Sequence, residues 1–228
     1  MFGASDICCR SRLVWDGDRK RRERGATCQH DGMADPSLAP PVAAPLPDVV
    51  TDRLDLRRFD LADLDELAEL FAHVEVWRYP YGRGFTRGET LAFLDSQIRE
   101  WSDLGFGCWV ARRIDDARII GYVGLSVPRF LAKILPAVEV GWRFAPSAWG
   151  LGYATEGATA ALDEAFDTLG LTSVCSLPQD DNAPSARVAE RLGMKLLGEV
   201  AIPANDRRGE LTALHYVIER DAWQSRRG

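Results

Sequence analysis

The pattern of hydrophobic and polar residues predicts alternating helices and strands from about residue 49 onward. In "TDRLDLRRF", Leu54 and Leu56 are two positions apart, which is the period of a strand with one buried face. In residues 60–71 the apolar side chains recur three and four positions apart, as on one face of a helix. A second helix is expected after Thr86, because Thr86 and Glu89 have the spacing of a capping box.

The second half of the chain alternates between the same two periods. Two strand-like runs around the turn Asp115-Asp116 predict a β-hairpin. The other expected elements are strands at 137–144, 172–177, 195–201 and 211–219 and helices at 154–169 and 183–193, the last one ended by Gly193. Antiparallel strands flanked by strand–helix units predict an α/β (α+β) fold with a mixed central sheet covered by helices.

Residues 1–48 lack such periodicity. "DGDRKRRERG" is a charged run, and "PSLAPPVAAPLP" is a Pro/Ala linker in which repeated proline prevents helices and sheet ladders. We therefore expect a disordered tail at 1–48, one folded domain at 49–222 and a short tail at 223–228. An alternative is that Met33 is the true start and that the upstream residues are a translation artefact.

Composition narrows the classes of function. The chain has 34 acidic and 28 basic residues, a net charge of −6, which argues against nucleic acid as its main partner. An acidic body suits a cationic acceptor such as an amine, and it equally suits solubility alone. No apolar run is long enough to span a membrane. The five cysteines form no CxxC pair and have no histidine partners at zinc spacing, so no metal site is expected. Cys108 and Cys175 lie in apolar, strand-like runs, which predicts reduced, buried thiols and a cytoplasmic protein.

One stretch carries a signal for ligand binding. "WGLGYATEG", residues 149–157, places glycines where a strand ends and a helix begins, so the unpaired N–H groups of the first helical turn point at the loop. Such a site binds phosphate, but an ordinary strand-to-helix turn has the same pattern. The stretch matches neither GxxxxGK[ST] nor the register of GxGxxG, which argues against a P-loop enzyme and a Rossmann dehydrogenase.

The segments around this stretch decide between the two interpretations. "EVGWRFAPSAWGLGYATEGATAALDEAF" followed by "QDDNAPSARVAERLGMKLLGE" resembles the GNAT superfamily of acetyl-CoA-dependent N-acetyltransferases, and most of all its RimJ/RimL-type branch. "TDRLDLRRF", "VWRY", "FLDSQIREW", "GFGCWVARR" and "IIGYVGL" occur in the order and spacing of that branch, so the resemblance covers about residues 50–219. The resemblance implies that residues 49–222 form an N-acetyltransferase domain.

The resemblance implies a mixed, mostly antiparallel sheet with a V-shaped split between "AVEVGWRF" and "TSVCSL", flanked by helices. Acetyl-CoA, the cosubstrate, would insert its pantetheine arm into that split and place its pyrophosphate on the loop at residues 149–154. Gly152 and Ala154 match the small positions of the family's Q/R-x-x-G-x-G/A loop, whereas Trp149 and Leu151 replace its polar residues. The residues that the resemblance assigns to acetyl-CoA are Val140, Gly141, Trp142, Trp149, Gly150, Leu151, Gly152, Tyr153, Ala154, Thr155, Asn182, Ser185 and Arg187.

The reaction requires a base, and Glu139 is the candidate. A lysine-like amine has a pKa of ~10.4, so fewer than one molecule in about a thousand is neutral at pH 7. Strand alternation places Glu139 on one face with Gly141 and Arg143. The alternative is that Glu139 only pairs with Arg143. Ser185, in the segment matching the family's N-x-x-S, is the candidate proton donor, and Asn182 with Ser185 can equally be a helix cap.

The sequence thus predicts an acyltransferase that moves acetyl from acetyl-CoA to a primary amine by direct attack, with no metal. The resemblance places the acceptor site near Trp77, Arg78, Tyr79 and Tyr81, and the acceptor would be a protein N-terminus or a small amine. A homodimer is compatible with the family. The rival prediction is a catalytically degenerate acyl-CoA-binding regulatory module, which the residues Trp149 and Leu151 favour.

Overall fold

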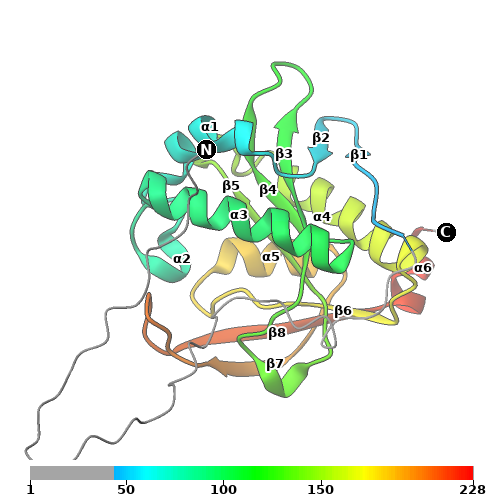
Figure 1. Ribbon diagram of the computed structural model, residues 1–228. Helices are drawn as coiled ribbons and strands as arrows, with labels where there is room; N and C mark the ends of the chain where they lie inside the picture. Colours follow the sequence, from blue (N-terminus) through cyan, green and yellow to red (C-terminus); the bar gives the residue numbers. More distant parts are fainter. Residues whose placement is uncertain (1–43, 228) are drawn as a thin grey trace, which may run out of the picture. The chain divides into compact units, whose positions relative to one another are not determined.

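A computed structural model describes residues 44–227, and these contain one mixed eight-stranded sheet covered by helices (Figure 1). The strands are β1 (Val49–Val50), β2 (Leu54–Arg57), β3 (Cys108–Arg113), β4 (Ile119–Ser126), β5 (Glu139–Phe144), β6 (Ser173–Ser176), β7 (Lys195–Ile202) and β8 (Leu211–Glu219). The helices are α1 (Leu64–Phe71), α2 (Arg78–Tyr81), α3 (Arg87–Leu104), α4 (Tyr153–Asp163), α5 (Ala183–Arg191) and α6 (Arg220–Arg227), with shorter helical turns between some of them.

The sheet has the strand order β1-β2-β3-β4-β5-β6-β8-β7. Neighbouring strands are antiparallel except β5 and β6, which are parallel. In Figure 1, β3 and β4 run up the view while β7 and β8 run across it, so the two parts of the sheet diverge. The predicted mixed, mostly antiparallel α/β sheet with flanking helices is therefore confirmed.

Alternation along the strands builds two hydrophobic clusters on opposite faces of the sheet. In β3, Cys108 and Val110 belong to a cluster with α1 and α3, whereas Trp109 and Ala111 belong to the larger cluster that includes α4 and α5. The capping box predicted at Thr86 is present, since its side chain accepts from Glu89 N and that of Glu89 accepts from Thr86 N. The positions of the sheet and helices relative to each other are thus set mainly by the apolar pattern.

Both ends of the packed region differ from the expected boundaries. Residues 1–43 of the expected tail lie outside the described residues, but Leu46 is fully buried and its backbone N–H donates to Gly105 O at 2.8 Å. At the other end, the expected tail at 223–228 is wrong as far as Arg227, because α6 runs to that residue and buries Trp223. The helix expected at 60–71 begins as a 3₁₀ turn that leaves Leu61 exposed. Leu46 and Trp223 are each an isolated large apolar residue, one in the Pro/Ala segment and one in a polar segment, so neither gave a periodic signal for its burial.

None of the helices in residues 44–227 is long and apolar enough to cross a membrane. Cys108 and Cys175 are free and buried, as predicted, and burial raises the pKa of both thiols.

Candidate acetyl-transfer site

The sheet opens between β5 and β6. The two strands share one register pair, Glu139 with Cys175, next to a hydrogen bond from Cys175 N to Val138 O at 2.9 Å. Beyond Glu139, β5 stays paired with β4 through Phe144, but it has no strand partner on its other edge within residues 44–227. The backbone groups on that edge are therefore available to an extended ligand, as a free sheet edge is.

A cavity of about 580 Å³ lies at this opening. Its wall combines β5, the β6–α5 connection, the segment around α2, and the β7–β8 loop. Residues of the wall include Trp77, Tyr79, Tyr81, Glu139, Gly141, Trp142, Arg143, Gln179, Asn182, Ser185, Arg207 and Arg208. A Cβ built at Gly141 would meet no atom within 4 Å, so β5 leaves open space at this point for a ligand to approach its backbone.

Glu139 lies in this wall in a half-buried position. Burial, with a smaller contribution from the charge of Glu100, raises the pKa of its carboxyl to about 7, although the hydrogen bond from the backbone N–H of Leu177 acts in the opposite direction. A carboxyl with that pKa exchanges protons near neutral pH, which is the property of a general base.

The structure contradicts the alternative in which Glu139 only pairs with Arg143. The guanidinium of Arg143 stacks on Trp77, with its carbon 3.9 Å from the ring centroid. Its Nε donates to the hydroxyl of Tyr122 at 3.1 Å, and its Nη1 donates to the carbonyl of Val76. Arg143 thus turns toward the segment before α2, and the described residues form no ion pair between it and Glu139.

The glycine stretch forms the turn between β5 and α4. Gly150 and Gly152 have φ angles of +75° and +88°, which side chains with a Cβ rarely adopt, and Gly152 is the N-cap of α4. No side chain from the described residues caps this helix end. The hydroxyl oxygen of Thr155 in the first turn is buried and has no hydrogen-bond partner among the described residues. An uncapped helix N-terminus beside an unpaired hydroxyl fits the phosphate cradle implied by the resemblance.

The two residues that depart from the family's loop have defined structural positions. Trp149 is 52% exposed, and its indole N–H donates to Phe144 O at 2.8 Å, which ties the loop to the end of β5. Leu151 has an exposed side chain, while its carbonyl accepts a hydrogen bond from Arg53 Nη1 at 2.9 Å. Neither side chain offers a charge to a phosphate, so the loop can supply only backbone groups and the Thr155 hydroxyl.

Arg53 is a residue of this site that the sequence pattern did not reveal. Besides Leu151, its guanidinium binds the carboxylate of Glu156 in α4, with Nε to Oε2 at 2.7 Å and Nη2 to the same oxygen at 2.5 Å. The carboxylate also accepts from the Arg53 backbone and from the hydroxyl of Thr51. We name Arg53, Glu156 and Thr51 the loop clamp. Its two charged members are 103 residues apart in sequence, so no local spacing connects them.

The predicted Asn182 and Ser185 both line the cavity at the start of α5. Asn182 is the N-cap, and its side-chain oxygen accepts from Ser185 N at 3.3 Å, so the capping prediction is confirmed. The hydroxyl of Tyr79 donates to the adjacent Asp181 O at 3.2 Å and brings a second hydroxyl group to this end of the cavity.

The remaining predicted residues divide between the core, the loop and the surface. The side chain of Val140 is fully buried in the larger cluster, so only its backbone faces the free edge of β5. Tyr153 is buried under Arg53 at the start of α4, and Ala154 packs beside it. Arg187 is exposed on α5, and neither it nor Arg78 lines the cavity. Trp77, Tyr79 and Tyr81 do line it, as Glu139 does.

Comparisons with known proteins identify the family to which the chain is similar. The sequence model of one protein family, described as "Acetyltransferase (GNAT) domain", matches residues 53–195. The chain is 32% identical over 147 residues to the uncharacterized protein YkkB of Bacillus subtilis, covering 64% of this chain and 84% of that protein. It is 28% identical over 150 residues to the uncharacterized N-acetyltransferase YnaD of the same organism, covering 66% of this chain and 84% of the relative. A solved acetyltransferase from Agrobacterium tumefaciens is 28% identical, with a TM-score of 0.60 over 76% of this chain and 95% of that one.

Proposed function

The chain belongs to the acetyltransferase (GNAT) family and is an acyltransferase, and from this premise we propose that it transfers acetyl from acetyl-CoA to a primary amine by direct attack. The observation that carries the proposal is the position of Glu139. A carboxyl with a pKa near 7 lies in a cavity at the point where β5 and β6 separate. The order of motifs along the chain supports the further proposal that the protein belongs to the RimJ/RimL-type branch of the family.

Residues of three elements would hold acetyl-CoA. The free edge of β5 from Val140 to Trp142 would pair with the pantetheine amides, with open space at Gly141. The loop from Trp149 to Gly152 and the first turn of α4 would hold the pyrophosphate through backbone N–H groups and the Thr155 hydroxyl. Asn182 would bind the arm near its thioester end. The acetyl thioester, when bound, supplies the activated carbonyl carbon.

Glu139 would take the proton that the attacking amine must lose. At pH 7 a carboxyl with a pKa of about 7 is ionised in roughly half of the molecules, so it can accept a proton directly or through one water. The amine nitrogen forms a bond to the carbonyl carbon, the carbon–sulfur bond breaks, and CoA leaves as a thiolate.

The leaving thiolate needs less assistance, since a thiol with a pKa of ~8.5 is a moderate leaving group at neutral pH. Ser185 and Tyr79 both present hydroxyl groups near the start of α5, on the side of the cavity formed by the β6–α5 connection. We assign to Ser185 the proton donation to the sulfur, with Tyr79 as the second hydroxyl within this part of the wall.

The experiment that tests the proposal is an assay of thiol release from acetyl-CoA with a panel of amines. The panel contains amino acids, a polyamine, an aromatic amine and a peptide with a free N-terminus, and mass spectrometry identifies the acetylated product. We expect one class of amine to increase the rate of thiol release above the rate of acetyl-CoA hydrolysis measured without amine.

The rival function, an acyl-CoA-binding regulatory module, rests on the two side chains that cannot contact phosphate electrostatically, Trp149 and Leu151. Calorimetry with CoA separates the two functions. Tight CoA binding without turnover of any amine would contradict the proposed transferase function and support the regulatory module.

A further inference from the structure

Arginine supplies most of the charge in the wall of the cavity. The charged residues that line it are Glu139, Arg143, Arg207 and Arg208. Asp206 and Glu210 belong to the same loop as the last two arginines but do not line the cavity. The acceptor side of this site is therefore positive, although the whole chain has a net charge of −6.

Arg143 carries a fixed charge that no carboxylate of residues 44–227 pairs with. Its hydrogen-bond acceptors, the Tyr122 hydroxyl and the Val76 carbonyl, are neutral, and its stacking partner Trp77 is an uncharged ring. These contacts hold the guanidinium in one orientation without cancelling its charge, which is the arrangement that stabilises a bound anion.

Arg207 and Arg208 are presented by an ordered turn between β7 and β8. The side-chain oxygen of Asn205 accepts from the backbone N–H groups of Arg207 at 2.9 Å and Arg208 at 3.1 Å. The guanidinium of Arg208 donates to the carbonyls of Pro203 and Gly209, which are also neutral.

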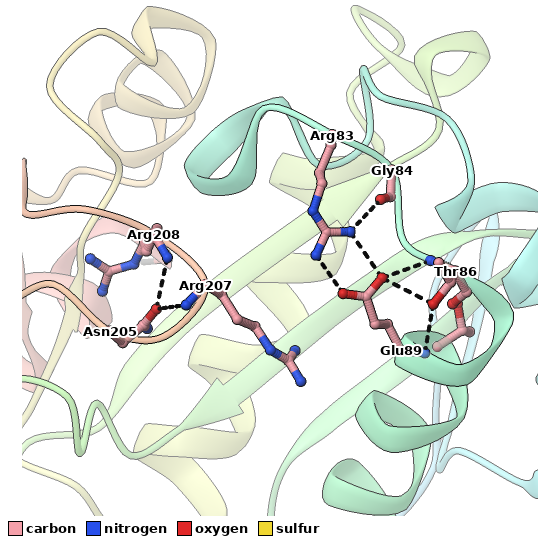
Figure 2. Close-up of polar contacts among 8 residues, drawn as sticks. Arg83, Gly84, Thr86, Glu89, Asn205, Arg207 and Arg208 are labelled. Carbon is pink, nitrogen blue, oxygen red and sulfur yellow. Dashed lines mark hydrogen bonds and ion pairs between the residues drawn. The ribbon is translucent and has the colours of Figure 1, made fainter.

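Among the described residues 44–227, the side chain of Arg207, unlike that of Arg208, makes no hydrogen bond, so it can bind a ligand. Figure 2 draws it together with Arg83 and Glu89 and shows its guanidinium without a dashed contact to either residue. Those two residues are already paired with each other, Nη2 to Oε1 at 2.5 Å, and Glu89 also caps α3. Among residues 44–227, neither Arg207 nor Arg208 takes part in an ion pair.

We propose that the acceptor is an amine that also carries an anionic group, a carboxylate or a phosphate, and that Arg207 together with Arg143 binds this group. The inference rests on the proposed transferase function and names its class of substrate. A guanidinium fits both anions through two parallel hydrogen bonds. The same positive charge disfavours the protonated form of a nearby amine and so raises the fraction that can attack. It also repels polyamines, which carry several positive charges and no negative one.

Matched pairs of amines test the proposal on the full-length protein. The pairs are lysine against 1,5-diaminopentane, phenylalanine against 2-phenylethylamine, and O-phosphoethanolamine against ethanolamine, and each pair differs only by the anionic group. The measured quantity is kcat/KM for thiol release at saturating acetyl-CoA. We expect the anionic member of at least one pair to be preferred by 10-fold or more, and the pairs distinguish carboxylate from phosphate. Equal rates in all three pairs, or faster reaction of the members that lack the anionic group, overturn the inference while the transferase function stands.

Arg207→Ser isolates the residue. We expect kcat/KM for the preferred anionic amine to fall about 10- to 100-fold, mainly through KM, as on loss of a charge-assisted hydrogen bond, with no change for the partner amine that lacks the anion. Arg99→Ser is the control, because Arg99 is an exposed arginine of α3 that does not line the cavity, and it should leave all values unchanged.

Two further results are decisive. If Arg207→Ser weakens CoA binding in calorimetry and slows both members of a pair equally, Arg207 binds the cosubstrate and the inference is wrong. If no amine reacts at all, the proposed transferase function fails. Titration of the CoA-loaded protein with the six amines then decides the inference. The inference is supported if the anionic amines bind to the wild type and no longer bind to Arg207→Ser. It is overturned if the anionic amines do not bind to the wild type, or bind equally well to Arg207→Ser.

Discussion

At the scale of single residues, the surroundings of Glu139 determine what its carboxyl can do. Glu139 has no cationic partner in the part of the chain that the structure describes, because Arg143 is held by Trp77, Tyr122 and Val76. Burial and the charge of Glu100 therefore raise its pKa to about 7, and no salt bridge lowers it among the described residues. A glutamate paired with Arg143 would be fully ionised at pH 7 but would also be a weaker base.

The first prediction concerns Glu139→Gln. Wild-type kcat/KM should rise with pH through about 7 and then level off, because Glu139 must be deprotonated and then removes the proton of the bound amine. The variant should lack this rise and lose about 10²-fold or more at pH 7. The loss should shrink toward pH 10, where the amine is largely neutral in solution. Steady-state thiol release between pH 5.5 and 10 measures both profiles.

The matched control is Glu199→Gln, since Glu199 is exposed on β7 and does not line the cavity. It should retain the wild-type profile. An unchanged profile for Glu139→Gln would remove Glu139 from the mechanism.

At the scale of elements, the N-terminus of α4 depends on a contact from another part of the chain. The loop clamp joins the segment before β2 to the first turn of α4, and Arg53 reaches the carbonyl of Leu151 in the glycine loop. Hydrogen bonds from Thr51 and Arg53 outweigh the effect of partial burial and lower the pKa of Glu156. The clamp thus fixes a loop whose two left-handed glycines give it little stiffness of its own.

The second prediction concerns Arg53→Ala, which removes this contact. We expect CoA to bind several-fold more weakly in calorimetry, because the loop must then be ordered by the ligand. The free energy of unfolding should change by about 1 kcal/mol or less, since the Arg53 side chain is 46% exposed and its ion pair is screened by solvent.

Arg87→Ala is the control for Arg53, because it breaks an exposed ion pair with Asp65 away from the loop. It should leave CoA affinity unchanged. Equal CoA affinity of Arg53→Ala and wild type would show that the loop does not need the clamp.

At the scale of the whole described region, α6 closes the larger hydrophobic cluster. Trp223 is 4% exposed, packs near Phe166, and donates its indole N–H to Asp163 Oδ1 at 2.9 Å. The same aspartate pairs with Arg227 at 3.1 Å. The last helix therefore stabilises the end of α4, the helix whose beginning carries the proposed phosphate site.

The third prediction follows for Trp223→Ala. We expect the free energy of unfolding to fall by about 3–5 kcal/mol, as for other buried tryptophans, measured by urea denaturation. Trp149→Ala should cost about 1 kcal/mol or less, because Trp149 is half exposed and loses a single hydrogen bond to Phe144 O. Similar losses in the two variants would show that α6 does not contribute to the core.

The sequence by itself determined the order of the elements, the helix cap at Asn182 and the face of β5 on which Glu139 lies. These follow from local spacing, since apolar periodicity shows which face of a strand or helix is buried and cap residues show where a helix begins. The family resemblance fixed the position of the glycine loop in the fold.

The tertiary structure alone decided which groups meet across the chain. It turned Arg143 toward Trp77 and away from Glu139, joined Arg53 to Glu156, extended the packed region to Leu46 and Trp223, and placed Arg207 in the wall of the cavity. None of these contacts has a local signature, because each depends on how far and at what angle elements distant in sequence pack together. The chemistry of the acceptor side is set by such contacts, and so its positive charge is opposite in sign to that of the whole chain.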